Sequence, residues 1–564
     1  MLPAALKVIL RKKTKTNMKH YLSILQDTIK KNWDKAALCN YKGEEISFRD
    51  LAVKIEKFHI FFNNIGIEKG QKIALCARNS AKWATTFLSI NTYGAVVVPL
   101  LNEFHPSSIS HLVSHSESKV LFTDAEIWAK LNKTETPELR AVINNNDYTL
   151  LYYADESVKK AFDGLKEAFE ARFPLGYERE NVNFDIPEGK ELAVINYTSG
   201  TTSAPKGVML RYECFSAMID FAIKQIQPDP DKTIVSMLPM GHIYGLSFEF
   251  LFPLCYGSSI YYFGKTPSPT LLLKAMQEIR PFMVVTVPLV MEKVYKSSIK
   301  PAISKWYMKV LLAIPGIGGI IYHKIGRKIM AAFGGRIEMF IMGGAALNPT
   351  VERCFKHIGI PYTVGYGMTE AAPLLAYSTP EDYVPGSCGR AVDCCEIRID
   401  SEDPQHIAGE ILAKGTNICS GYFNNPDASA NAFTDDGFLR TGDLGIMDKD
   451  GNIFIKGRSK NMILSANGQN IYPEEIEAII NAHDYVAESV VVDRSSKLVA
   501  LVFLDKDAIK KAGLDDEAIS DIPENVRVNS NRQLPSYSQI TKIELVLTPF
   551  EKTPKMSIKR FLYK

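Results

Sequence analysis

The chain has 564 residues, and its 66 lysines and arginines against 63 acidic residues give a formal net charge of +3. Apolar residues make up 46% and charged residues 23%, which is typical of a folded globular protein and excludes a disordered chain. The near-neutral charge gives no nucleic-acid-binding footprint, and the length predicts two or three domains. The nine cysteines are odd in number and lack metal-ligand spacing. We therefore expect reduced, mostly buried thiols in a cytoplasmic protein.

The N-terminus does not resemble a signal peptide. Its short apolar run precedes Arg11-Lys12-Lys13, which reverses the usual charge order, and Met18 is an alternative start. The longest apolar stretch, Val310 to Tyr322, is interrupted by Pro315 and glycines and is too short to span a bilayer. Its flanking lysines leave open a peripheral contact with the inner face of a membrane. We favour a buried helix pair joined by a Pro-Gly turn.

From Ser47 onward, helical and strand patterns alternate. The apolar run Lys72–Ala77 predicts a strand, Ser80 is expected to cap a helix running to about Tyr93, and another strand follows at 96–98. The pattern resumes later, with further strands predicted at 234–238, 283–287 and 337–342. This alternation predicts an α/β fold with parallel or mixed sheets covered by helices.

The patterns also predict where the domains divide. Short strands and turns from about Asp393 predict a β-rich subdomain over about 393–456. Beyond it, Pro473 opens a helix, and strands are predicted at 486–492 and 498–504. We therefore predict a large N-terminal domain, 1–458, and a small mobile α+β domain, 459–564.

The loop from Tyr197 to Val208 predicts a phosphate-binding site. It follows the apolar strand 192–195, so it should leave the sheet at a strand's C-terminal end, where α/β sheets bind ligands. Gly200 and Gly207 allow backbone N–H groups to turn inward, and Lys206 supplies a positive charge. The loop also offers the hydroxyls of Thr198, Ser199, Thr201 and Thr202. Its order differs from the Walker A loop, and taken alone it also fits a flexible linker.

Further motifs follow the loop in a fixed order. They are Leu238-Pro-Met-Gly-His-Ile-Tyr-Gly245, Gly343-Gly-Ala-Ala-Leu347, Gly365-Tyr-Gly-Met-Thr-Glu370, Gly421-Tyr-Phe-Asn-Asn-Pro426, Thr441-Gly-Asp443 and Gly457-Arg-Ser-Lys460. Together they closely resemble the AMP-forming acyl-CoA synthetases of the adenylate-forming superfamily, over nearly the whole chain from about Ser47. The resemblance implies that a carboxylic acid reacts with ATP to give an acyl adenylate and pyrophosphate, and that the acyl group then passes to a thiol.

The resemblance also implies residue roles. The loop residues Thr198 to Thr202 and Lys206 would hold phosphates, Thr369 the α-phosphate, and Glu370 a Mg²⁺ ion. Tyr366, between Gly365 and Gly367, would stack on adenine, and Gly343, Gly344 and Ala345 would line its edge. The remaining implied roles are ribose binding for Asp443 and Arg458, gating of the acyl pocket for His242 and Tyr244, a domain hinge for Lys460, and the approach to the thiol tunnel for the loop ending at Gly468.

Two positions depart from the family pattern. Ser203 replaces a usual glycine in the phosphate loop, and Ser557 occupies the place of the family's catalytic C-terminal lysine. A serine offers no cation to the forming acyl phosphate, so this change should slow adenylation by orders of magnitude. Lys555 and Lys559 lie two residues away on either side and share a face with Ser557 in an extended tail. Either lysine is a candidate replacement.

Three functions fit the sequence. We favour a fatty acid CoA ligase using ATP, Mg²⁺ and CoA, because the segment 287–294 and the helical insertion after it resemble the long-chain branch, where this region walls a hydrophobic tunnel. The second is an adenylating enzyme that loads a carrier-protein phosphopantetheine. The third is an impaired protein that binds nucleotide or acyl adenylate, and it rests on Ser557 alone.

Overall fold

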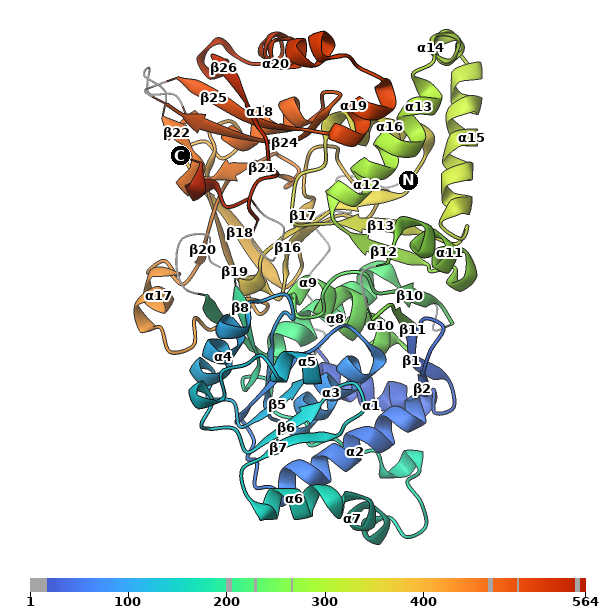
Figure 1. Cartoon of the computed structure of the whole chain (residues 1–564), viewed down its shortest axis with the longest axis vertical. Helices are drawn as coiled ribbons and strands as arrows, with labels where there is room; N and C mark the ends of the chain where they lie inside the picture. The colour runs from blue at the N-terminus through green and yellow to red at the C-terminus, as the bar shows by residue number, and fades with distance from the viewer. Residues whose placement is uncertain are drawn as a thin grey trace, which may run out of the picture.

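The computed structural model describes residues 18–198, 205–227, 231–264, 267–464, 470–494, 497–552 and 558–563. Two seven-stranded sheets with covering helices form a large N-terminal region, and a smaller α+β domain follows it at the top of the view in Figure 1. The predicted α/β class, with parallel and mixed sheets and a small C-terminal domain, is confirmed.

The first large sheet carries the predicted phosphate loop. Its strands are parallel except at the two edges, where β7 and β9 pair antiparallel to their neighbours. In spatial order they are β7 (Leu150–Tyr153), β6 (Ala141–Asn144), β5 (Val120–Thr123), β3 (Lys72–Cys76), β4 (Val96–Pro99), β8 (Leu192–Thr198) and β9 (Lys206–Arg211).

The second large sheet is parallel apart from the antiparallel edge strand β2. In spatial order its strands are β14 (Tyr362–Val364), β13 (Met339–Met342), β12 (Met283–Thr286), β10 (Thr233–Val235), β11 (Ser259–Tyr262), β1 (Ala36–Asn40) and β2 (Glu45–Ser47). Strand β10 ends earlier than the sequence predicts, because the backbone N–H groups of Met237 and Leu238 donate to the Glu249 carboxylate rather than to a neighbouring strand.

Both faces of these sheets are buried, which explains their uninterrupted apolar strands. In β3, Ile73 and Leu75 join one core cluster with α2, α3, α8 and α10, whereas Ala74 and Cys76 face α4 and α5 in another. The helices around the first sheet and the shared core are α1 (Tyr21–Lys31), α2 (Phe48–Asn64), α3 (Ala81–Tyr93), α4 (Pro106–His115), α5 (Ala125–Trp128), α6 (Glu156–Asp163), α7 (Leu165–Arg172), α8 (Tyr212–Ile226) and α10 (Phe252–Tyr256). Ser80 caps α3 by accepting from the Trp83 N–H, as predicted.

The outer face of the second sheet packs against a separate set of helices. Val284 of β12 and Phe340 of β13 contribute to this apolar cluster. The helices are α11 (Pro269–Ile279), α12 (Pro288–Val294), α15 (Ile317–Ala332) and α16 (Pro349–Ile358). On α15, a β-carbon at Gly326 would lie 1.9 Å from the Ile358 carbonyl oxygen, so only glycine permits this close approach to α16.

A β-rich region connects the large sheets to the small domain. It holds a three-stranded sheet, a four-stranded antiparallel sheet and a two-stranded ribbon. Their strands are β15 (Tyr366–Gly367), β16 (Leu374–Tyr377) and β17 (Arg390–Ala391), then β18 (Cys395–Asp400), β19 (Gly409–Gly415), β20 (Leu439–Met447) and β21 (Ile453–Arg458), then β22 (Ile463–Leu464) and β23 (Asn470–Ile471). Helix α17 (Pro426–Asn431) lies between β19 and β20 in the chain.

The small domain is built on a three-stranded sheet and three helices. They are β24 (Val486–Asp493), β25 (Leu498–Leu504), β26 (Lys542–Val546), α18 (Pro473–Asn481), α19 (Lys506–Ala512) and α20 (Asp516–Asn531). Polar contacts join this domain to the large region. The Lys296 ammonium donates to the carbonyl oxygens of Asn481 and Val486 at 3.4 and 3.3 Å, and Lys300 forms an ion pair with Asp484.

Helices α13 (Lys300–Ile303), α14 (Trp306–Ala313) and α15 form an arm that projects from the large region, with α14 at its tip (Figure 1). The Pro-Gly turn predicted here is confirmed, since α14 and α15 flank residues 314–316. The predicted burial is wrong, because Val310, Ile314, Ile317 and Ile320 are all exposed. Among the described residues, no single helix is long and apolar enough to cross a membrane; α14 and α15 reach that length and apolarity only together, with a bend of 118° between them.

All nine cysteines lie in described segments, and all are free thiols. Seven are buried, and the adjacent pair Cys394 and Cys395 is partly exposed. The expectation of mostly buried cysteines is confirmed. Burial raises the pKa of most of these thiols, as for Cys39, whose pKa rises to about 12, so they are poor nucleophiles.

Candidate active site

The predicted phosphate loop joins the antiparallel strands β8 and β9. Thr198 ends β8, Lys206 begins β9, and the two residues face each other across the hairpin. The Thr198 hydroxyl donates to the Lys206 carbonyl oxygen at 3.4 Å. Ser199, Gly200, Thr201 and Thr202, as well as Ser203, lie outside the described residues. The hairpin therefore places Thr198 and Lys206 together at the C-terminal end of β8, as expected.

Tyr422 links this hairpin to the predicted magnesium ligand. The Lys206 ammonium lies 4.9 Å from the centroid of the Tyr422 ring, and the Tyr422 hydroxyl donates to Glu370 Oε1 at 3.0 Å. Backbone hydrogen bonds hold the tyrosine in place: the Met209 N–H donates to the Gly421 carbonyl at 3.0 Å, and the Phe423 N–H to the Gly207 carbonyl at 2.8 Å. Tyr422 had no predicted role, although the motif that contains it was visible in the sequence.

Glu370 is a buried carboxylate, with 8% of the residue exposed, next to Thr369 in the short 3-10 helix η6 (Thr369–Ala371). Burial and the nearby Glu370 charge raise the pKa of Tyr422, so its hydroxyl stays a donor to the carboxylate. The described part of the chain contains no group of three or more His, Cys, Asp or Glu that could hold a metal alone. One carboxylate completed by phosphate oxygens is nevertheless a usual Mg²⁺ environment, so Glu370 fits the predicted ion.

A second cluster joins Asp443, Tyr366 and Arg458. Asp443 and Arg458 face each other on β20 and β21, and Arg458 Nε lies 3.0 Å from Asp443 Oδ1. The Tyr366 hydroxyl donates to the other carboxylate oxygen at 2.8 Å. Burial raises the pKa of Asp443, which is 6% exposed, and the Arg458 charge opposes this rise. The sequence motifs place these residues around one nucleotide, and in the structure Tyr366 and Arg458 both contact Asp443.

The glycines beside Tyr366 and those predicted to line the adenine edge lie where backbone comes close to other groups. A β-carbon at Gly367 would lie 2.0 Å from the Pro373 carbonyl oxygen, and one at Gly365 would lie 3.1 Å from Leu374 Cδ1. A β-carbon at Gly343 would lie 3.2 Å from Cζ of Tyr244. Gly344 has a φ of +84° and, like Ala345, is exposed, so this loop presents open backbone after β13. Such open backbone suits the flat edge of a base.

His242 and Tyr244 lie in a turn that a buried glutamate stabilises. The Tyr244 hydroxyl donates to the Ile341 carbonyl at 3.2 Å, and His242 precedes the short helix α9 (Ile243–Gly245). Glu249, which is fully buried, accepts from the Ser236 hydroxyl at 3.0 Å and from the Leu238 N–H at 2.9 Å. Burial raises its pKa to about 8. The sequence did not reveal the role of Glu249. It is a single acid within a short apolar run, and such a pattern does not indicate which groups the acid contacts.

The predicted C-terminal residues are only partly described. Lys460 lies in the short 3-10 helix η7 (Ser459–Asn461), directly after β21, at the junction of the β-rich region and the small domain. Lys559 forms an ion pair with Glu551, and Arg560 holds the buried Glu477 through two hydrogen bonds. Gly468, Lys555 and Ser557 lie outside the described residues.

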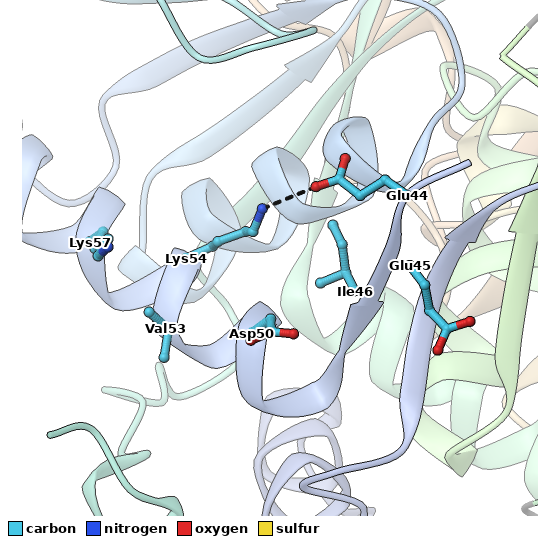
Figure 2. Close-up of a pocket in the computed structure, with 7 residues that line it drawn as sticks. All are labelled: Glu44, Glu45, Ile46, Asp50, Val53, Lys54 and Lys57. Atoms are coloured by element: carbon cyan, nitrogen blue, oxygen red, sulfur yellow. Dashed lines mark hydrogen bonds and ion pairs between the residues drawn. The ribbon is translucent and has the colours of Figure 1, made fainter.

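A separate depression lies beside β2 and the start of α2. It is lined by Glu44, Glu45, Ile46, Asp50, Val53, Lys54 and Lys57 (Figure 2). Lys54 points to Glu44, with 3.4 Å between the charged atoms, so these two opposite charges in the depression compensate each other. None of the sequence motifs reaches it, and we assign it no function.

The two clusters contain two cations, Lys206 and Arg458, and two buried carboxylates, Glu370 and Asp443, and β21 with η7 leads from the second cluster to the small domain. Buried acids of this kind, next to open glycine backbone, are typical of the binding site of an enzyme.

The chain belongs to the AMP-binding enzyme family: the family model for AMP-binding enzymes matches residues 25–423, and the model for their C-terminal domain matches residues 460–563. The chain is 29% identical over 478 residues to long-chain-fatty-acid–CoA ligase 4 of Saccharomyces cerevisiae, covering 78% of this chain and 67% of that protein. It is 26% identical over 563 residues to long-chain-fatty-acid–CoA ligase FadD15 of Mycobacterium bovis, covering 92% of this chain and 90% of that protein. The resemblance to AMP-forming acyl-CoA synthetases is thereby confirmed.

Solved structures show the same fold. ATP-bound MatB from Rhodopseudomonas palustris is 23% identical with a TM-score of 0.74, over 96% of this chain and 98% of that one. The anthranilate CoA ligase AuaEII in complex with anthranoyl-AMP is 19% identical with a TM-score of 0.77, over 97% and 96% of the two chains.

Proposed function

We propose that the protein activates a fatty acid with ATP to form acyl-AMP and pyrophosphate, and then transfers the acyl group to CoA. The observation that carries the proposal is the chain of contacts from Lys206 through Tyr422 to Glu370. It sets a cation and a buried carboxylate beside the hairpin that is predicted to hold phosphates. The names of the relatives at 26–29% identity support a fatty acid as the substrate.

The reaction has two balanced steps. In the first, a carboxylate oxygen of the acid attacks the α-phosphorus of ATP, and the bond to the β-phosphate oxygen breaks and releases pyrophosphate. In the second, the thiolate of CoA attacks the acyl carbon, and AMP leaves with the electron pair of the broken bond. Neither step needs a covalent protein nucleophile, so the protein contributes position and electrostatic stabilisation.

The described residues fit these needs. Lys206 would neutralise phosphate oxygens, while Asp443 would accept hydrogen bonds from ribose hydroxyls beside Arg458. One Asp443 oxygen accepts a hydrogen bond from the Tyr366 hydroxyl and the other forms an ion pair with Arg458, and a carboxylate oxygen with two lone pairs can also accept from a ribose hydroxyl. A Mg²⁺ ion bound by Glu370 would supply further charge neutralisation on the phosphates. Tyr422 would orient the Glu370 carboxylate toward that position.

We further propose that residues 1–458 and 459–564 act as two domains that rotate at Lys460 between the steps. A hinge needs only to absorb a change in backbone dihedrals, and the position of Lys460 directly after β21 suits this. The polar contacts of Lys296 and Lys300 with the small domain can break in water at low cost.

One observation favours an impaired enzyme as the second candidate. Lys559 is one of two lysines that would replace the missing lysine at position 557, and it forms an ion pair with Glu551. To reach a substrate, its ammonium would have to leave that carboxylate. An impaired first step would leave a protein that binds acyl adenylate and carries out thioester formation only.

The test is a pyrophosphate-release assay with ATP, Mg²⁺ and a panel of acids of increasing chain length, with and without CoA. Acid-dependent release that CoA accelerates, highest with long-chain acids, would support the proposal. Release with short or aromatic acids alone would refute the fatty acid assignment. Transfer of the acyl group to a phosphopantetheine carrier protein but not to CoA would refute CoA as the acceptor.

A matched experiment tests the impaired alternative. Supplied acyl adenylate and CoA should give thioester at the same rate in the wild type and in Ser557→Lys. If only the variant releases pyrophosphate, the wild type is impaired in adenylation. The variants Lys555→Ala and Lys559→Ala then identify which lysine, if either, carries the first step in an active wild type.

A further inference from the structure

The tip of the arm, residues 306–322, exposes apolar side chains that nothing in the described chain covers fully. No residue of α14 is buried, and Trp306, Val310 and Ile320 are 78%, 57% and 69% exposed. Tyr307, Ile314 and Ile317 are exposed as well. These side chains form one contiguous stretch of sequence at the end of a projection (Figure 1).

This exposure contradicts the composition of the helix. Seven of the eight residues of α14 are apolar, and a helix that is apolar on all sides is normally found in a protein core or in lipid. Within the described chain, α14 makes its main contacts with α13 and α15 of its own arm. The described residues leave the remaining surface of α14 exposed, and exposed apolar surface of this kind is typical of an interaction site.

The charge around the tip identifies the kind of partner. Between residues 293 and 337 the sequence contains nine lysines and arginines and no aspartate or glutamate. Since the whole chain carries only +3, the rest of the molecule is net negative. The nine cations are Lys293, Lys296, Lys300, Lys305, Lys309, Lys324, Arg327, Lys328 and Arg336. In the sequence the apolar tip is thus flanked by positive charge alone, and of these cations Lys296 and Lys300 also contact the small domain.

We propose that the arm tip docks on the surface of a membrane that contains anionic lipids. Exposed Trp306 and Tyr307 next to Lys305 and Lys309 are typical of the membrane interface, where aromatic rings lie at headgroup level and lysine stems extend toward phosphate groups. Positive charge around an apolar helix is the pattern of interfacial helices.

The arm lies in the membrane interface and does not span the bilayer. The eight residues of α14 extend about 12 Å, well short of the roughly 30 Å of a hydrocarbon core. The 118° bend before α15 turns the chain back toward the large region. Gly326, packed on α16, then fastens α15 to that region.

The charge argues against a second copy of this chain as the partner. Two tips that meet face to face would bring two sets of cations together without any acidic residue to compensate them. Membrane docking does not depend on which acid the enzyme activates. Docking would place the enzyme next to a membrane, which also dissolves long-chain fatty acids.

Vesicle sedimentation of the full-length protein tests the proposal. We expect binding to phosphatidylcholine vesicles that contain phosphatidylglycerol, and at least about tenfold weaker binding to phosphatidylcholine alone or in high salt. Equal binding to both kinds of vesicle, or binding to neither, would overturn the proposal.

Two triple variants separate the apolar and the charge contributions. Trp306→Ala, Val310→Ser, Ile320→Ser removes exposed apolar groups, and Lys305→Glu, Lys309→Glu, Lys324→Glu reverses the local charge. Each should weaken binding to anionic vesicles by at least about tenfold. The matched control is Lys130→Glu, Lys166→Glu, Lys190→Glu, which reverses three exposed lysines elsewhere. If the control weakens binding equally, net charge rather than the arm is responsible.

Two further measurements distinguish membrane docking from a loss of folding and from self-association. Melting temperatures and pyrophosphate release with a water-soluble acid should match the wild type in every variant, because the arm lies outside the candidate active site. Trp306→Phe should remove most of the fluorescence blue shift that vesicles produce, although the chain has four tryptophans. If sedimentation velocity instead shows that the apolar variant dissolves a dimer, the tip is a contact between copies and the proposal fails.

Discussion

The candidate active site and the arm tip depart from the usual distribution of residues in opposite ways. In the site, Glu370, Asp443 and Glu249 are acids that are buried, and each has a hydrogen-bond partner. At the tip, Trp306 and Ile320 are apolar side chains that are exposed. Buried polar groups and exposed apolar groups are the informative exceptions to normal burial. In our proposals, both exceptions mark surfaces that receive a partner, which is a charged small molecule at the site and an apolar layer at the tip.

The largest effect is expected for Glu370→Gln. Removing the charge that would bind Mg²⁺ should lower the rate of pyrophosphate release by about 10²-fold or more, because the developing phosphate charge loses its counter-ion. The melting temperature should change little, since the Tyr422 hydroxyl can still donate to the amide oxygen. An unchanged rate would contradict the role of Glu370. Glu68→Gln, which changes an exposed acid shortly after α2, serves as the control.

Asp443→Asn should act mainly on ATP binding. The amide keeps the size of the carboxylate but loses a charged acceptor, so the KM for ATP should rise by about tenfold to a hundredfold. The maximal rate at saturating ATP should fall less. A fall in kcat with an unchanged KM would place Asp443 in the chemical step instead of in ribose binding.

Tyr422→Phe should have a moderate effect. It deletes the hydroxyl that donates to Glu370 and keeps the ring next to Lys206. The rate of pyrophosphate release should fall by about three- to tenfold, which corresponds to one hydrogen bond. Tyr422→Ala removes the ring as well and should cost more. If both variants behave alike, the additional loss of the ring has no effect and only the hydroxyl matters.

Glu249→Gln tests whether the buried Glu249 has a raised pKa, because such a pKa makes the stability of the protein depend on pH. The pKa of Glu249 in the folded protein, about 8, is higher than the value of 4.5 expected when it is unfolded. The folded protein therefore binds the proton more tightly, and wild-type stability should fall as pH rises from about 5 to 8. The melting temperature of the variant, minus that of the wild type, should therefore increase as the pH rises over that range. Parallel curves would show that Glu249 does not titrate there.

The smallest effect is expected at the arm tip. Ile320→Ser changes a side chain that is 69% exposed, so the free energy of unfolding should change by no more than about 0.5 kcal/mol. Thermal unfolding without membranes measures this. Ile260→Ser, at a fully buried position of β11, provides the contrast and should lower the melting temperature strongly.

The sequence predicted most of the fold because its signals are local. The strand at 72–76, the cap at Ser80 and the helix opened by Pro473 all lie where their residue patterns predict. The motif residues Asp443 and Arg458 also proved to be in contact. These features depend on neighbouring residues or on a family pattern.

The sequence could not reveal features that depend on distant packing. The contact between Tyr422 and Glu370 joins residues 52 positions apart through a segment that pairs with β9. The early end of β10 depends on Glu249, which reaches back to Met237. The exposure of α14 was also beyond reach, because an apolar helix has the same sequence whether a core or a membrane covers it.

The contacts of Lys296 and Lys300 with the small domain have one more consequence. Both lysines also belong to the positive field of the arm, and an ammonium group that serves Asp484 or a helix-end carbonyl is less available to an anionic surface. Any ligand that draws these lysines away must loosen the small domain, and by thermodynamic reciprocity a turn of that domain must change the affinity of the arm for the ligand. If the arm docks on a membrane and the small domain rotates as proposed, these two shared side chains would couple the location of the enzyme to the half-reaction it is in.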